Sequence, residues 1–145
     1  MPLFGPTMPT PLIDEDTQEF WEACGEHRLV VQRCRVCAHF RFAPAPVCYH
    51  CHSFEYEWVE SDGVGEVYSW TVTYRAVHPA TVDAVPYNTV VVRLFDCGGA
   101  MITSNLVDVD NEAIDAGMRV QLWWDDISPG VSLPRFRPVP IDPVG

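Results

Sequence analysis

The chain has 145 residues, of which 48% are hydrophobic, so it is long and apolar enough to bury one core. Its formal net charge is −11, and all nine basic residues are arginines. This acidic balance argues against nucleic-acid binding, and the absence of lysine excludes Schiff-base chemistry. No run of 18 apolar residues would span a membrane, and the first 11 residues lack the features of a signal peptide, so we expect a cytoplasmic protein.

The N-terminal region divides into an arm and a helix. Four prolines in the first 11 residues predict an extended arm over residues 1–13, ordered only where a partner holds it. Residues 14–27 predict a helix, because acidic residues crowd its start, where they suit the helix dipole. Asp14 or Asp16 is the expected cap, and Gly25 marks the expected end.

Residues 28–61 have the pattern of a zinc ribbon. A strand predicted over 28–33 runs into one C-x-x-C pair, and a second pair precedes a strand predicted over 56–60. Two short hairpins that each carry a cysteine pair at the turn are the arrangement of a ribbon that holds a metal ion.

The cysteines of these pairs are the strongest site signal in the chain. They are Cys34, Cys37, Cys48 and Cys51, with ten residues between the pairs. Four thiolates can surround one zinc ion at about 2.3 Å and leave no position for water, which predicts a structural Zn²⁺ and not a catalytic one. A rubredoxin-like iron site would use the same ligands, and disulfides are disfavoured in a cytosolic protein.

The neighbouring histidines and the two remaining cysteines receive weaker assignments. His39, His50 and His52 flank the pairs; each is able to replace a thiolate, but with four thiolates present we expect them around the metal site or in solvent. Cys24 is expected on the buried face of the helix. Cys97 precedes two glycines in a turn, with no base in view to activate it.

Residues 62–140 read as all β. The predicted strands are 67–74, 88–95, 100–107, 118–124 and 131–137. In the first of them Tyr68, Trp70, Val72 and Tyr74 alternate with polar residues, as in a half-buried strand. A helical turn over 110–116 precedes the fourth strand, which fits a Greek-key OB-fold barrel, with a β-sandwich as the alternative. The expected fold is therefore mainly β, with an N-terminal helix, a rubredoxin-like zinc ribbon, a C-terminal OB-fold barrel and a tail over 141–145.

No nucleophile, base and orienting group can be assembled from this pattern, so no catalytic residue is assigned. His78 lies in the loop between the first two barrel strands, where OB-folds place ligand contacts. Asp125 and Asp126 are neighbours on a strand, so their side chains point opposite ways, and we expect both in solvent.

Three further residues are candidates for a contact with a ligand or with a partner protein. Arg135 and Arg137 flank Phe136, and alternation on a strand places both guanidinium groups on one side, where they suit a phosphate or a partner carboxylate. Ordinary surface salt bridges are the alternative. Trp123 is on the polar side of its strand, either as an interface anchor or packed under the ribbon or arm.

The order of motifs resembles a known family. The motifs are FWEACGEHRLVVQRCRVCAHFRFAPAPVCYHC, then WVESDGVGEVYSWTV, the dipeptide Pro86-Tyr87 and the closing LPRFRP. Over residues 14–138 they are similar to the zinc-ribbon/OB-fold proteins that accompany thiolase-superfamily enzymes, a former domain of unknown function.

This resemblance implies a small, non-catalytic subunit of a heteromeric acyl-CoA-processing complex. A thiolase-like large subunit would carry the chemistry on a CoA thioester, and Arg135, Arg137, His78 and Trp123 are then candidates for contact with CoA or with that partner. The chain looks most like the small subunit of steroid side-chain aldolases, which perform retro-aldol cleavage. The alternatives are a subunit of a thiolase, of an acyltransferase or of a hot-dog-fold enoyl-CoA hydratase, or an independent acyl-CoA or nucleic-acid binding module.

Overall fold

The computed structural model describes residues 2–140, so the tail predicted over 141–145 lies outside the described residues. Its elements are α1 (Gln18–Gly25), β1 (Leu29–Cys34), β2 (Phe40–Arg41), β3 (Tyr56–Ser61), β4 (Val64–Thr73), the 3₁₀ turn η1 (Pro79–Thr81), β5 (Tyr87–Leu94), β6 (Met101–Ser104), the 3₁₀ turn η2 (Asn111–Ala113), β7 (Arg119–Ser128) and β8 (Val131–Pro138). No helix in this part of the chain is both long and apolar enough to cross a bilayer.

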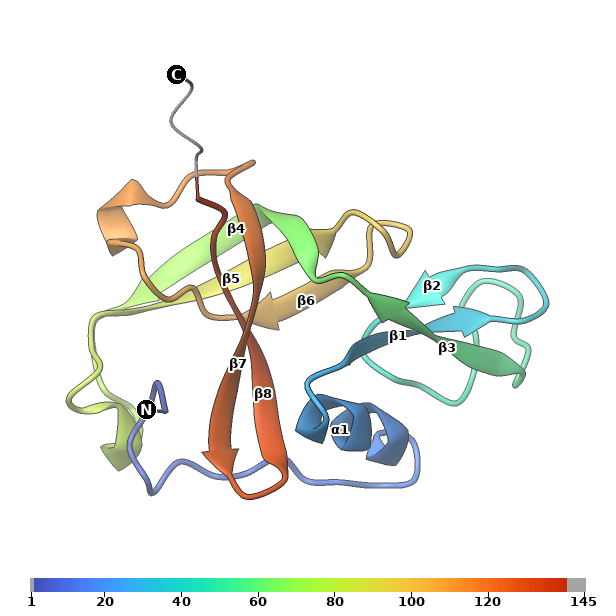
Figure 1. Cartoon of the computed structure of the whole chain (residues 1–145), viewed down its shortest axis with the longest axis horizontal. Helices are drawn as coiled ribbons and strands as arrows, with labels where there is room; N and C mark the ends of the chain where they lie inside the picture. The colour runs from blue at the N-terminus through green and yellow to red at the C-terminus, as the bar shows by residue number, and fades with distance from the viewer. Residues whose placement is uncertain (1, 141–145) are drawn as a thin grey trace.

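The strands form two antiparallel sheets that lie side by side (Figure 1). The ribbon sheet has the order β2-β1-β3, and the barrel sheet has the order β6-β5-β4-β7-β8. A parallel bridge between Leu106 and Phe136 joins the end of the β6 segment to β8. Phe136 N–H donates to the Asn105 carbonyl over 3.1 Å, and Val107 N–H donates to the Phe136 carbonyl over 2.9 Å. This near-closure, with η2 before the fourth strand, confirms the OB-fold prediction over the sandwich.

The strand β4 departs from the simple alternation that its sequence suggests. A bulge between Val67 and Ser69 shifts its register against β5. Such a bulge bends the strand: β4 pairs with β7 only over Val64–Glu66, before the bulge, and with β5 on both sides of it. Val67 is buried, whereas Tyr68 and Trp70 are 54% and 38% exposed. The aromatic side of β4 therefore faces outward.

The helix begins later than the sequence suggests. Residues before α1 form a turn in which the Asp14 carboxylate accepts hydrogen bonds from the Asp16 and Thr17 main-chain N–H groups over 3.1 and 3.0 Å. These local bonds compete with helix geometry and delay the first helical residue to Gln18. Gly25 ends the helix, and a Cβ on Gly25 would lie 2.7 Å from the Gly130 carbonyl oxygen, so the helix end is held against the β7–β8 turn.

Helix α1 lies between the ribbon sheet and the lower part of the β7–β8 hairpin (Figure 1). Its buried residues are Phe20, Ala23 and Cys24. They belong to the same core cluster as Val31 of the ribbon and Val67 of the barrel. Burial of this shared apolar surface fixes the ribbon on the barrel, because separating the two would expose it to water.

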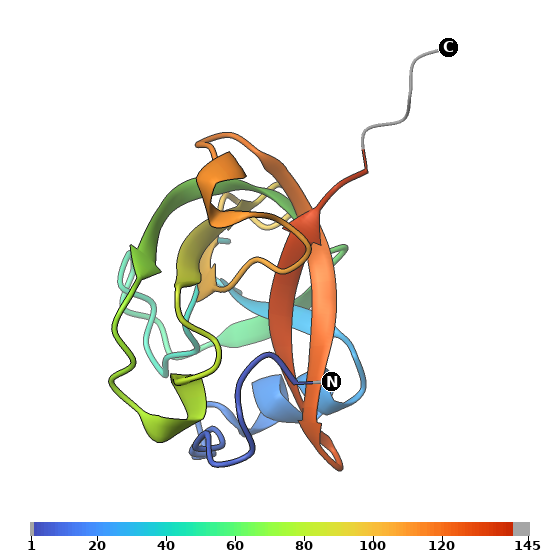
Figure 2. The ribbon, with the colours of Figure 1, turned by 90° about the vertical axis from the view of Figure 1, so that its left-hand side faces the viewer.

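The N-terminal arm is held by the chain's own barrel, contrary to the expectation that it needs a partner to order it. Leu3 N–H donates to the Asp125 carboxylate over 3.3 Å, and Gly5 N–H donates to the Ala80 carbonyl over 2.9 Å. The Phe4 ring packs edge-on against Tyr87, with ring centroids 5.2 Å apart. Figure 2 shows this segment starting beside the lower half of the β7–β8 hairpin and crossing from there toward η1.

Candidate metal centre

The two cysteine pairs sit on loops with the same backbone geometry. Ala38 N–H donates to the Cys34 carbonyl over 3.0 Å, and His52 N–H donates to the Cys48 carbonyl over 2.8 Å. Ala38 and His52 both have a positive φ, at 63° and 65°. The main-chain N–H groups of Cys34 and Cys48 then donate to the carbonyl five residues on. These matched turns point both sulfur pairs at one place.

The four sulfur atoms are spaced for a single metal ion. The Cys34 and Cys51 sulfurs are 3.5 Å apart, those of Cys37 and Cys48 are 3.6 Å apart, and all four lie within 4.8 Å of one another. Ligands at about 2.3 Å around a tetrahedral ion are separated by about 3.8 Å, whereas a disulfide would bring two sulfurs to about 2.0 Å. The residues therefore fit a closed four-thiolate metal site.

The turns favour the thiolate form at two of the four ligands, Cys34 and Cys48. Main-chain hydrogen bonds also favour the thiolates of Cys37 and Cys51, but burial and the neighbouring sulfurs outweigh them and raise the pKa of both thiols. The main-chain N–H of Cys37 is the largest influence on Cys34 and lowers the pKa of that thiol. The main-chain N–H of Cys51 acts in the same way on Cys48 and lowers its pKa to about 6. Hydrogen bonds to the anionic sulfur stabilise it, so these two ligands are prepared for metal before an ion arrives.

The three histidines near the cysteine pairs are exposed, but only two of them, His39 and His50, contact each other. The imidazoles of His39 and His50 are stacked, with ring centroids 4.1 Å apart and planes 11° apart. His39, His50 and Cys37 place their ligand atoms within 4.8 Å of one another, a grouping that does not include His52. Sequence reasoning placed these histidines near the metal, but only folding brings two of them into contact.

The two remaining cysteines are structural. Cys24 lies on the buried face of α1, as predicted, and burial raises its pKa to about 12. Cys97 is also fully buried, and burial, followed by the charge of Asp96, raises its pKa to about 11. Neither thiol has the accessible, thiolate-favouring surroundings of a nucleophile.

The neighbouring residues Asp125 and Asp126 have different surroundings: Asp125 is buried and Asp126 is exposed. Asp125 and Asp126 point opposite ways, as predicted, but the expectation that both are solvated is wrong for Asp125, which is 1% exposed. Asp125 accepts a hydrogen bond from Arg135 Nε over 3.1 Å. Asp126 stays exposed and contacts His27 over 2.6 Å; hydrogen bonds from Ser132 and then His27 lower the pKa of its carboxyl group.

The candidate arginines are not an exposed pair. Arg135 is 9% exposed; besides Asp125, its guanidinium contacts the Asn105 side chain and lies 5.4 Å from the centre of the Phe4 ring. Burial lowers its pKa, which its contact with Asp125 partly offsets. Arg137 is half-buried on the same strand. The sequence missed this arrangement because Arg135 is covered by the arm and by Asn105, which lie far from it along the chain.

The last two candidate contacts come from different elements, the loop before η1 and the strand β7. The His78 imidazole caps η1, because its Nδ1 accepts a hydrogen bond from Ala80 N–H over 3.1 Å. Trp123 is half-buried and lies directly across from Arg135 on β8. The structure does not bring His78 and Trp123 together with Arg137 into a single described pocket.

Fold and site together define a two-part protein in which a rubredoxin-like four-cysteine ribbon is fixed to an OB-fold barrel. Residues 21–57 match the family model of the ChsH2 rubredoxin-like zinc ribbon domain, and residues 58–125 match that of the ChsH2 C-terminal OB-fold domain. The chain belongs to the ChsH2/DUF35 family.

Three relatives illustrate this membership. A solved structure of an Ltp2–ChsH2(DUF35) aldolase is 40% identical, with a TM-score of 0.79, and the match covers 88% of this chain and 98% of that one. A probable enoyl-CoA hydratase alpha subunit from Thermomonospora curvata is 40% identical over 90% of this chain, which spans only 40% of that relative's length. A DUF35 domain-containing scaffold protein from Pyrococcus furiosus is 30% identical over 71% of this chain and 74% of its own length.

Proposed function

We propose that this chain is a non-catalytic subunit of a heteromeric acyl-CoA-processing complex. Its large partner is a thiolase-like enzyme, and the reaction is retro-aldol cleavage of a steroid side-chain CoA thioester. The observation that carries the proposal is the 40% identity to the Ltp2–ChsH2(DUF35) aldolase, which extends over nearly the whole of both chains. In this role the four-cysteine site holds a structural Zn²⁺ and takes no part in the reaction.

The chemistry of the described residues supports a non-catalytic role. The four clustered thiols suit a closed metal site, and Cys24 and Cys97 are buried with raised pKa values. Arg135 is occupied by a buried carboxylate. These groups are already paired or inaccessible and cannot approach a CoA thioester, which supports the assignment of the reacting residues to the partner.

The outward side of β4 supports an assembly role. Tyr68 and Trp70 are exposed there, and Tyr74, just beyond the strand, is 74% exposed. Aromatic residues are enriched at protein interfaces because they bury a large area at little cost in conformational entropy. We assign the partner-binding surface to Tyr68, Trp70 and Tyr74, and call it the β4 aromatic surface.

Co-expression with a thiolase-like partner tests the proposal. We expect the two proteins to co-purify and the complex, but neither chain alone, to cleave the CoA thioester. Tyr68→Ala/Trp70→Ala should weaken co-purification, whereas Phe54→Ala, which removes an aromatic residue that is 73% exposed on the ribbon, should not. Full activity of the partner alone would refute the function. If Phe54→Ala lost co-purification and Tyr68→Ala/Trp70→Ala kept it, the β4 aromatic surface would be refuted as the partner-binding surface.

Contacts with the CoA thioester itself are a narrower proposal. Arg137, His78 and Trp123 each keep part of the side chain accessible, so we retain them as contacts with CoA or with the partner. Arg135 is removed from this set because its guanidinium is buried. Calorimetry should detect no CoA thioester binding to the isolated chain; tight binding would favour an independent acyl-CoA binder instead.

The second candidate function is a subunit of an enoyl-CoA hydratase complex. It is favoured by the 40% identity to the probable enoyl-CoA hydratase alpha subunit of Thermomonospora curvata over 90% of this chain. Parallel co-expression with a hot-dog-fold hydratase partner separates the two. Hydration of an enoyl-CoA by that complex, without co-purification of a thiolase-like partner, would select the hydratase assignment.

A further inference from the structure

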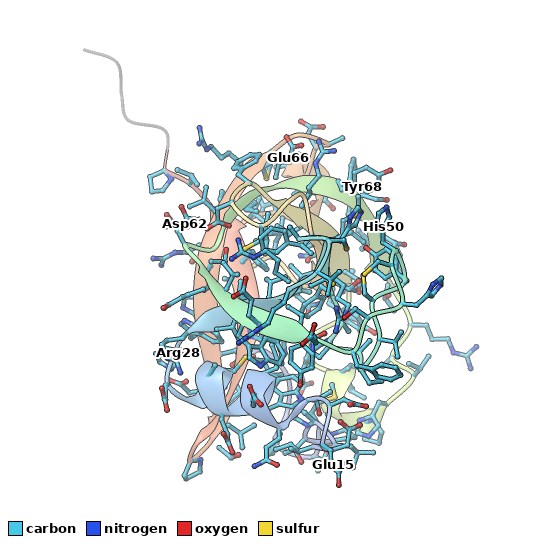
Figure 3. All side chains as sticks on the ribbon, turned by 90° about the vertical axis from the view of Figure 1, so that its right-hand side faces the viewer. Glu15, Arg28, His50, Asp62, Glu66 and Tyr68 are labelled. Atoms are coloured by element: carbon cyan, nitrogen blue, oxygen red, sulfur yellow. The ribbon has the colours of Figure 1, made fainter. Side chains whose placement is uncertain are left out.

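His39 and His50 form a feature that the four-thiolate site does not use. His39 follows Cys37 by two residues, and His50 lies between Cys48 and Cys51, so each cysteine turn contributes one imidazole. The rings stack with centroids 4.1 Å apart. Both are exposed, and Figure 3 shows His50 near the edge of the molecule, on the side of the ribbon away from Arg28.

The position of this pair is fixed by the ribbon. Cys34 N–H donates to the His39 carbonyl over 2.8 Å, which ties the His39 backbone to the first turn. The Tyr49 hydroxyl donates to the Phe40 carbonyl over 3.2 Å and links the second turn to the same segment. The His39 and Tyr49 rings also pack edge-on, with centroids 6.2 Å apart. The backbone segments that carry the two imidazoles are therefore held close together by the ribbon.

The nitrogens of the pair are available for a metal ion. Among the hydrogen bonds of residues 2–140, no side-chain bond involves the His39 or His50 ring, whereas the rings of His27 and His78 are engaged with Asp126 and Ala80. One ring nitrogen of His39, one ring nitrogen of His50 and the Cys37 sulfur all lie within 4.8 Å of one another. Ligands at about 2.1 to 2.3 Å from a tetrahedral ion are separated by about 3.4 to 3.8 Å, so an exposed side chain needs to move by only about 1 Å.

The third ligand is a sulfur that already serves the structural ion. Cys37 is half-buried, unlike Cys34 and Cys48, which are fully buried. A metal-bound thiolate keeps lone pairs with which it can bridge to a second ion. Four thiolates around a divalent ion also leave a net negative cluster, which attracts a further cation.

We propose that His39, His50 and Cys37 form a second, auxiliary transition-metal site, with Zn²⁺ as its ion. Two imidazoles and a thiolate are the ligand types that Zn²⁺ and Co²⁺ prefer. Three ligands from the chain leave one position open to solvent, in contrast to the closed four-thiolate site. The site does not depend on the proposed aldolase or hydratase role.

The test counts metal ions on the full-length chain that carries its structural zinc. Native mass spectrometry during titration with Zn²⁺ should show a second equivalent on the unmodified protein. His39→Asn/His50→Asn should keep the first equivalent and lose the second. His52→Asn is the matched control: His52 is also exposed, lies on the same loop as His50 and outside the cluster, and asparagine tolerates its positive φ.

The role of Cys37 is read by spectroscopy, because replacing it would disrupt the structural ion. Co²⁺ added to the zinc-loaded chain should give a sulfur-to-cobalt charge-transfer band that is absent from the double histidine variant. The proposal is overturned by a single equivalent on the unmodified chain or by a second equivalent that survives the double substitution. A second equivalent that depends on His52, or one without the charge-transfer band, also overturns it.

Discussion

The buried ion pair between Asp125 and Arg135 allows a sharp test of how the barrel holds its arm. We consider Arg135→Met, which keeps a long side chain but removes the charge. Asp125 is 1% exposed and would lose the donor that lies 3.1 Å away, while Leu3 N–H would remain as a weaker partner at 3.3 Å. A buried carboxylate would then lack a compensating charge.

The expected magnitude follows from this geometry. Two unit charges 3.1 Å apart attract by about 5 kcal/mol at an effective dielectric constant of 20, and desolvation of both groups offsets much of that gain. Removal of one partner leaves the desolvation cost without the attraction, which amounts to about 3 to 5 kcal/mol. The double variant Asp125→Leu/Arg135→Met removes both charges and should recover most of the loss.

Urea unfolding of zinc-saturated protein, followed by circular dichroism, measures these free energies. Limited proteolysis reports on the arm, and we expect faster cleavage within residues 2–13 in the single variant because Asp125 and Arg135 both contact the arm. A loss below about 1 kcal/mol for Arg135→Met would show that the pair behaves as an exposed surface pair, and the reasoning would be refuted. A double variant as unstable as the single one would also refute it.

The remaining predictions concern metal, pH and thiol reactivity. Cys48→Ser or removal of the metal by a chelator should unfold the ribbon, because metal binding supplies on the order of 10 kcal/mol of folding free energy. Either change should also lower the melting temperature of the whole chain, because the ribbon and the barrel share one core. An unchanged melting temperature would contradict this. Burial alone would raise the pKa of Asp96, but hydrogen bonds from Asp62 N–H and the Ser61 hydroxyl lower it. The stability that ionised Asp96 contributes is therefore present above about pH 4 and is lost as pH falls through its lowered pKa. The difference in urea midpoint between wild type and Asp96→Asn should accordingly shrink on acidification. A difference that widens would show that the pKa of Asp96 is not lowered by folding. Cys24 and Cys97 should resist iodoacetamide at neutral pH in the folded protein and react after denaturation, as mass spectrometry would show, and rapid labelling in the folded state would refute their burial.

The local patterns in the sequence were sufficient for the metal site and for the order of the elements. Cys34 and Cys48 each begin a C-x-x-C turn, and such a turn converges its sulfurs through local hydrogen bonds alone. The start of α1 was less predictable. Asp14 is a good cap by type, but its bonds to the following N–H groups form a separate turn and not the first turn of the helix.

Side-chain roles on the barrel were hard to predict because distant segments decide them. Alternation put Tyr68 and Trp70 on one side of β4, but it could not tell which side faces the core after the bulge. Arg135 was expected at the surface because its own strand does not reveal that Phe4, from the arm, lies over its guanidinium.

Residue patterns along the chain were enough to predict the four-cysteine ribbon and the order of the elements, because these depend on residues that are close in sequence or on a regular alternation. The same patterns favoured a barrel but left a β-sandwich open until the near-closure between the β6 segment and β8 was seen. The folded structure was needed to show which charges are buried, that the arm lies on its own barrel, and that His39 and His50 stack beside Cys37. These contacts join segments that meet only after the chain has folded. Their strength depends on the exclusion of water or on exact proximity, and neither is encoded in local spacing.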